Sequence, residues 1–219
     1  MAGSMSPASP ESHPASTAPP FPRPRRPFGP PPEAAARHWY EDVLGWATAP
    51  GAPLRLVTGV GFDVLDVPAE AGAGALRHLA PASPVALVGG RMRLLVAAGS
   101  AEELPGLLDW LEWGALALDL RALGAGGLTE APAPPVRAVG AAVPRPGARA
   151  MQGAAVWLRP PEPGRVEAVL PALPSFEGVT GAPDLVRLVD TVAAQCHRVR
   201  LRRGAGPRSR GCDQPLAFS

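Results

Sequence analysis

Hydrophobic residues along the chain follow two patterns: short apolar runs, and longer stretches with helical spacing. Apolar runs of about four to eight residues bounded by Gly or Pro are typical of strands. Such runs occur at Leu54–Val60, Phe62–Val67, Val85–Val88, Arg91–Ala98, Ala115–Leu120, Val136–Val143 and Gly153–Leu158. Apolar positions three and four residues apart are typical of helices. They predict helices at Pro32–Gly45, Ala69–Leu79, Ser100–Gly114 and Pro183–Val199.

Two of the predicted helices carry further signals. The first helix has an aromatic-rich stripe suited to a core, with base stacking as the alternative role: Ala36, Trp39, Tyr40 and Val43. In the third helix, Ser100 and Glu103 have the spacing of a capping box, although Pro105 is an alternative first residue. The stripe therefore indicates which side of the first helix is buried.

The order of these elements predicts an α+β fold with a mixed sheet covered by helices, because several strands follow one another before the next helix. We expect this domain at residues 32–174. An amphipathic helix with a basic C-terminal end is expected at 175–204, followed by a tail at 205–219.

Proline is concentrated at the ends of the chain and limits the folded domain. The chain has 219 residues, including 30 Pro and 25 Gly, which is enough for one domain with tails. Residues 1–31 form a Pro/Ser/Ala-rich tract whose rings favour extended polyproline II and supply no amide donors. We therefore expect a disordered leader that can hold a protein partner.

Charge and cysteine content exclude several classes of protein. The net charge of +2 argues against a globally basic nucleic-acid coat protein. All 21 basic residues are Arg in a chain that also lacks Asn and Ile, as GC-rich coding predicts. Cys196 and Cys212 have no CxxC spacing. No segment approaches the about 20 apolar residues of a membrane span, so we expect a cytoplasmic protein without membrane contact.

The candidate chemistry lies in carboxylates on predicted strands. The sequence has no Walker A loop, no GxGxxG, HExxH or GxSxG motif, and no Cys/His metal spacing. Asp63, Asp66 and Asp119 lie among aliphatic residues, where a charge needs a partner. Converging carboxylates can hold Mg²⁺ or Mn²⁺ against a triphosphate. The alternative is that Asp63 faces solvent and Asp119 pairs with an Arg.

Several short motifs follow one another in a defined order between residues 34 and 174. They are Leu44-Gly45-Trp46, Val64-Leu65-Asp66-Val67, Gly89-Gly90-Arg91-Met92-Arg93, Leu118-Asp119-Leu120-Arg121 and Val156-Trp157-Leu158. Together they resemble the bifunctional DNA primase/polymerase family. The resemblance implies an archaeo-eukaryotic primase-like fold, a role in DNA replication, and nucleotidyl transfer with Mg²⁺ or Mn²⁺. Asp66 and Asp119 match two of the family's metal-binding acids.

Two of the family's catalytic positions differ in this chain. The family has a second acid two positions after the first, where this chain has Pro68. Where the family has its catalytic His, the chain has Arg91, Met92 or Arg93. Asp63 lies three residues before Asp66, which in a regular strand puts the two on opposite faces unless a bulge intervenes. Losing a metal-bridging carboxylate weakens two-metal catalysis by orders of magnitude, so we expect a residual metal site and degenerate catalysis.

Arginines are the predicted phosphate contacts. In the domain these are Arg91, Arg93 and Arg121. After the last apolar helical positions, a predicted nucleic-acid-binding tail comprises Arg198, Arg200, Arg202 and Arg203. The sequence therefore predicts an accessory factor that binds a nucleotide or a nucleic acid such as DNA.

Two other functions are compatible with the sequence. An active primase/polymerase would need Asp63 or Glu70 to replace the missing acid, with Mg²⁺ or Mn²⁺ as cofactor. An inactive protein needs no cofactor. A non-enzymatic interaction scaffold would use the Pro-rich leader and the Arg-rich tail to hold partners.

Overall fold

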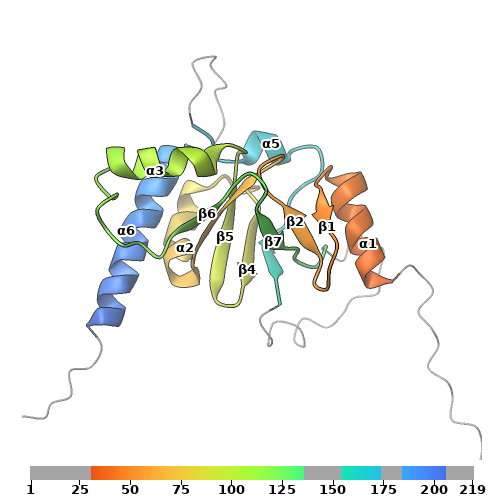
Figure 1. Ribbon diagram of the computed structural model, residues 1–219, viewed down its shortest axis with the longest axis horizontal. Helices are drawn as coiled ribbons and strands as arrows, with labels where there is room; N and C mark the ends of the chain where they lie inside the picture. The colour runs from red at the N-terminus through yellow and green to blue at the C-terminus, as the bar shows by residue number, and fades with distance from the viewer. Residues whose placement is uncertain (1–30, 136–153, 174–183, 206–219) are drawn as a thin grey trace, which may run out of the picture. The chain divides into compact units, whose positions relative to one another are not determined.

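The computed structural model describes residues 31–135, 154–173 and 184–205, which form helices and two sheets (Figure 1). The predicted leader apart from Pro31, the predicted strand Val136–Val143 and the predicted tail after Ala205 lie outside these residues. In chain order the elements are α1 (Pro32–His38), the π-helix η1 (Trp39–Val43), β1 (Thr48–Ala49), β2 (Arg55–Val57), β3 (Asp63–Pro68), α2 (Ala69–Ala75), the 3₁₀-helix η2 (Leu76–His78), β4 (Val85–Val88), β5 (Arg91–Val96), α3 (Ser100–Trp110), β6 (Arg121–Leu123), β7 (Leu128–Glu130), β8 (Val156–Arg159), α5 (Val166–Val169) and α6 (Leu185–Gly204). None of the helices in the described ranges is both long and apolar enough to cross a membrane.

The larger sheet has five strands in the order β6-β3-β5-β4-β8, and each neighbouring pair is antiparallel. The β4–β5 hairpin turns at Gly89 and Gly90, whose φ angles of 52° and 81° are readily adopted only by glycine. The α+β class is confirmed, but the sheet is antiparallel rather than mixed, because this hairpin reverses the chain beside β3. The smaller sheet, β1-β2-β7, is also antiparallel.

Side chains alternate between the two faces of the five-stranded sheet. On one face, Leu65, Val67 and Leu94 belong to the hydrophobic cluster formed with α2, α3 and α6. On the other face, Val64 and Leu95 belong to a second cluster, which α1, η1, the smaller sheet and α5 complete. Helices α2, α3 and α6 therefore cover one face, and Asp66, which alternates with Leu65, lies on the opposite face.

The C-terminal helix α6 is part of the main core. It buries seven residues against the sheet and α2: Leu185, Leu188, Val189, Val192, Ala193, Cys196 and Val199. Asp184 caps its N-terminus, because its carboxylate accepts hydrogen bonds from the amides of Val186 at 2.9 Å and Arg187 at 3.3 Å. The predicted apolar face of this helix is confirmed.

The predicted strand Ala115–Leu120 is wrong. The segment forms turns and bends, and the strand that pairs with β3 is the shorter β6. The carbonyl of Ala117 accepts a hydrogen bond from Arg200 at 2.6 Å, and the carbonyl of Asp119 accepts one from the Cys196 thiol at 3.8 Å. Bonds to α6 thus use carbonyls that a sheet ladder would need.

The first and second predicted helices also change geometry along their length. The first continues from α1 into the π-helix η1, where Trp39 and Tyr40 are buried as predicted but Val43 is 43% exposed. The wider π-turn moves Val43 off the buried side. The second predicted helix is α2 followed by the single 3₁₀ turn η2.

A carboxylate from another element caps helix α3. The residue before the helix is Gly99, with φ of 89°, and Ser100 is the first helical residue, so the predicted Ser100 capping box does not form. Instead Asp63 on β3 accepts a hydrogen bond from the amide of Ala101 at 2.9 Å, through Oδ2. Asp63 is fully buried, and its Oδ1 has no hydrogen-bond partner within the described ranges. Asp63 therefore connects β3 to α3.

Replacing Asp63 with Ala should lower the free energy of unfolding by about 1–2 kcal/mol, because the Ala101 amide loses its buried acceptor. Asp63→Asn is the matched control, since its amide oxygen still accepts this bond.

Burial raises the pKa of Asp63, so the folded protein holds the proton more tightly than the unfolded chain does. The part of the protein's stability that depends on the Asp63 proton is lost as the pH rises above the ordinary value of 3.8 and through the folded pKa. The Asn variant should therefore gain stability relative to wild type over that range.

Urea unfolding at several pH values measures both effects. An Asp63→Ala variant as stable as the wild type at every pH would contradict the capping role.

Candidate functional site

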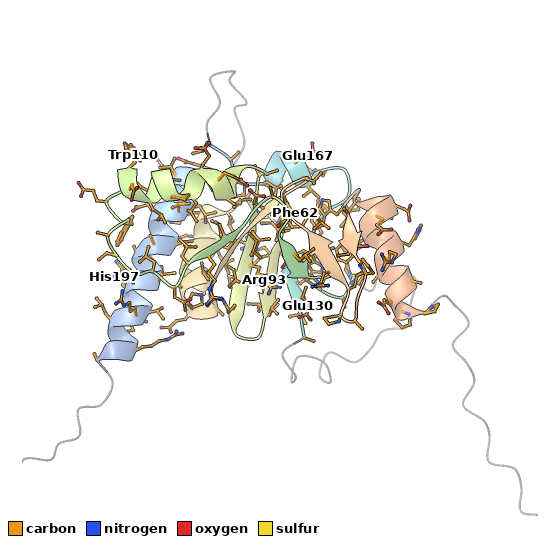
Figure 2. All side chains as sticks on the ribbon, in the orientation of Figure 1. Phe62, Arg93, Trp110, Glu130, Glu167 and His197 are labelled. Atoms are coloured by element: carbon orange, nitrogen blue, oxygen red, sulfur yellow. The ribbon has the colours of Figure 1, made fainter. Side chains whose placement is uncertain are left out.

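One row of residues across the five-stranded sheet brings three predicted site residues together. Asp66 on β3 lies opposite Arg93 on β5 and opposite Arg121 on β6. Arg91 is two residues before Arg93 and therefore points to the same side of the sheet. This side, which we call the arginine face, is the one opposite α2, α3 and α6. Figure 2 shows Arg93 over the sheet among the surrounding side chains.

The Asp66 carboxylate is bound by two guanidinium groups. Its Oδ1 accepts a hydrogen bond from Nε of Arg91, and its Oδ2 accepts one from Nε of Arg93 at 3.3 Å. Nη2 of Arg91 also donates to the main-chain oxygen of Asp66 at 3.0 Å. Asp66 is only 8% exposed. A carboxylate with so little access to water needs these cations as its partners.

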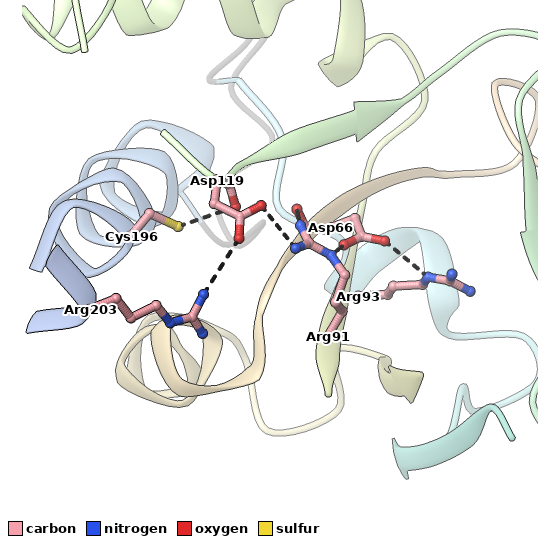
Figure 3. Close-up of polar contacts among 6 residues, drawn as sticks. All are labelled: Asp66, Arg91, Arg93, Asp119, Cys196 and Arg203. Carbon is pink, nitrogen blue, oxygen red and sulfur yellow. Dashed lines mark hydrogen bonds and ion pairs between the residues drawn. The ribbon is translucent and has the colours of Figure 1, made fainter. Parts of the chain in front are cut away.

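Asp119 continues the network toward α6. Its Oδ1 accepts a hydrogen bond from Nη1 of Arg91 at 2.9 Å, and its Oδ2 lies 3.9 Å from Nη1 of Arg203. The residues come from β5, α6 and the irregular segment before β6, and Figure 3 shows Asp119 between the two arginines. Arg91 therefore bridges Asp66 and Asp119, the two candidate catalytic acids.

The network changes the electrostatics of its members. Burial opposes the charged form of Arg91, but hydrogen bonds to Asp66 and Asp119 outweigh it, and the pKa of Arg91 is raised. Burial, with a smaller contribution from the Asp119 charge, raises the pKa of Cys196 to about 11. The thiol therefore stays protonated at neutral pH and is a hydrogen-bond donor rather than a nucleophile.

The carboxylates do not fit a divalent metal in this arrangement. Both oxygens of Asp66 and of Asp119 face guanidinium groups, and Pro68 stands where a second acid would be needed. Asp63 is held by α3 on the opposite face, and Glu70 pairs with Arg202 at 2.8 Å. Within the described ranges, no group of three or more His, Cys, Asp or Glu side chains is placed to hold an ion.

The predicted tail arginines lie on the last turns of α6. Arg200 donates to the Ala117 carbonyl, Arg202 pairs with Glu70, and Arg203 lies near Asp119. Arg198 is exposed, as is Arg121 on β6. Three of the four predicted tail arginines therefore contact the domain itself.

Sequence reasoning missed the polar groups around Arg93. Nη1 of Arg93 and Oγ1 of Thr129 are buried, and neither has a hydrogen-bond partner in the part of the chain that the structure describes. Together with Glu130 and Trp157 they line a cavity of about 10 Å³, large enough for about one water molecule. Thr129 and Glu130 lie on β7, in a different sheet, and no local pattern could have indicated that they meet Arg93.

Asp66→Asn should lower the free energy of unfolding by about 2–3 kcal/mol, because Arg91 and Arg93 lose the counterion they share. The matched control is Asp119→Asn, which removes a charge from the same network at a more exposed position and should cost about 0–1 kcal/mol. Denaturant unfolding of the two variants measures the difference. A catalytic carboxylate that is repelled by neighbouring negative charges can often be removed without loss of stability. If Asp66→Asn were as stable as the wild type, the counterion role of Asp66 would be wrong.

Comparison of the chain with known proteins gives no independent identification. Neither a family model, nor a curated protein, nor a solved structure matches it. The resemblance to the primase/polymerase family stays a prediction.

Proposed function

We propose that this domain is a non-catalytic module that binds the phosphates of a nucleotide or a nucleic acid through the arginine face together with Arg203 of α6. The observation that supports the proposal best is the pairing of Asp66 with both Arg91 and Arg93. Two candidate catalytic acids are used as counterions in this network, which holds three guanidinium groups against two carboxylates. The net charge of the network is positive, and a positive surface attracts an anion.

The geometry of the guanidinium groups suits phosphate. Arg offers several donors in one plane and keeps its charge at any physiological pH, so it binds phosphate oxygens with defined orientation. Asp66 fixes the Nε atoms of Arg91 and Arg93, which limits the side-chain entropy lost on binding. Arg121 is exposed on the edge strand β6, opposite Asp66. The fixed arginines thus form a prepared site, with Arg121 as its accessible member.

An active primase/polymerase is the enzymatic alternative. It would require Asp66 and Asp119 to leave their arginines and a third acid to join them. Primer extension with Mg²⁺ or Mn²⁺ tests it directly, and template-directed incorporation that disappears in Asp66→Ala would favour the enzyme. An interaction scaffold, the other alternative, would bind no nucleic acid at physiological salt.

Arg121→Gln should weaken binding of a labelled oligonucleotide several-fold, because one phosphate contact is lost. The slope of log affinity against log salt should become shallower by about one. Arg187→Gln is the matched control. It removes the same charge from an exposed position in the first turn of α6, at the end of the helix far from Arg203, and should leave the affinity nearly unchanged. Fluorescence anisotropy over a range of salt concentrations gives both quantities. Equal affinities of the two variants, or no binding by the wild type, would contradict the proposal.

A further inference from the structure

We infer that the ligand is a polynucleotide strand, and that one of its phosphates replaces Asp119 between Arg91 and Arg203. The inference rests on the proposed phosphate-binding function and names its ligand class and the residue that regulates it. In Figure 3 the Asp119 carboxylate occupies the position between the two guanidinium groups.

The exposure of Asp119 and its long contact with Arg203 support displacement of this carboxylate by a phosphate. Its side chain is 40% exposed, and that of Arg203 is 62% exposed. The distance of 3.9 Å between Oδ2 of Asp119 and Nη1 of Arg203 is longer than a hydrogen bond. Water and salt screen the attraction between two such exposed charges. Asp119 also lies on an irregular segment, outside the sheet ladder. Asp66, by contrast, is nearly buried and held by three hydrogen bonds, so it stays in place when an anion binds.

The position between Arg91 and Arg203 suits a phosphate. Nη1 of Arg91 already donates to an anionic oxygen there, and Nη1 of Arg203 points to the other oxygen of the same group. A phosphate supplies oxygens for both donors. Because Asp66 holds Nε and Nη2 of Arg91, the arginine does not need to rearrange when Asp119 leaves.

The arginines continue on both sides of Asp119, which favours a strand over a single nucleotide. Arg121 follows Asp119 by two residues and is exposed on the edge strand β6, and Arg202 on α6 reaches Glu70. The Glu70 end of α2 lies against the β4–β5 turn, since the amide of Ala69 donates to the Gly90 carbonyl at 3.0 Å. Arg91 and Arg203 therefore flank Asp119 and Arg121 lies close by in the chain, so a strand can reach more arginines than the pair that one phosphate of a mononucleotide would contact.

Asp119→Asn is the decisive variant, tested with fluorescein-labelled oligothymidylate and, separately, with dTTP. Removing the competing carboxylate should tighten oligothymidylate binding by about three- to tenfold and make the salt slope steeper by about one. The matched control is Glu103→Gln, an exposed acid on α3 with the same charge change, which should alter affinity less than twofold. In the Asp119→Asn background, Arg203→Gln should remove the gain. dTTP should bind the wild type more weakly than the oligomer and with a shallower salt slope.

Each outcome decides the inference. Unchanged or weaker oligothymidylate binding by Asp119→Asn, an equal gain in Glu103→Gln, or dTTP binding as tight as the oligomer would overturn it. If only the Asp119→Asn gain is missing while the wild type binds and Arg121→Gln weakens it, the proposed function stands alone. Absence of binding by both the wild type and Asp119→Asn would remove the proposed function as well. A thermal melt within a few degrees of the wild type shows that the variant is folded, and Asp119→Ser repeats the test if Asn fails this condition.

Discussion

A carboxylate on an inner strand of a sheet has little access to water, and its charge must be neutralised by neighbouring groups. Asp66 meets this requirement through Arg91 and Arg93 on the adjacent strand, in the register that also aligns β3 with β5. The remaining parts of the site follow from that pairing. Arg91 is oriented by Asp66, Asp119 is positioned by Arg91, and α6 approaches through Arg203 and Cys196.

The same pairing accounts for the proposed loss of catalysis. Two-metal catalysis uses carboxylates whose negative charge is available to cations. With Arg91 and Arg93 beside Asp66 and with Pro68 at the position of a second acid, positive charge is already supplied by the protein. In the proposed function the site therefore binds an external anion in place of a metal, and phosphate is the proposed anion because guanidinium groups match its geometry.

The sequence predicted the features that depend on local pattern. The strand Val85–Val88 has the predicted bounds, the first residue of β5 is the predicted one, and the alternation rule placed Asp63 and Asp66 on opposite faces. The errors arose where distant contacts decide the structure. Residues 115–120 have a strand-like pattern, but hydrogen bonds from α6 hold them in an irregular path, and only the register of β3 indicates that pairing starts at Arg121. Likewise, the Asp63 cap and the contact between Asp119 and Arg203 join residues far apart in the chain, so spacing alone could not indicate them.

The central claim is that Asp66 is the counterion of Arg91 rather than a metal ligand, and a double-mutant cycle tests it most directly. The cycle compares the wild type, Asp66→Asn, Arg91→Gln and the double variant by denaturant unfolding without added metal. The account predicts a favourable coupling energy of about 1–3 kcal/mol, as expected for two charges in direct contact. A coupling energy of about zero, with the two single effects adding in the double variant, would contradict it.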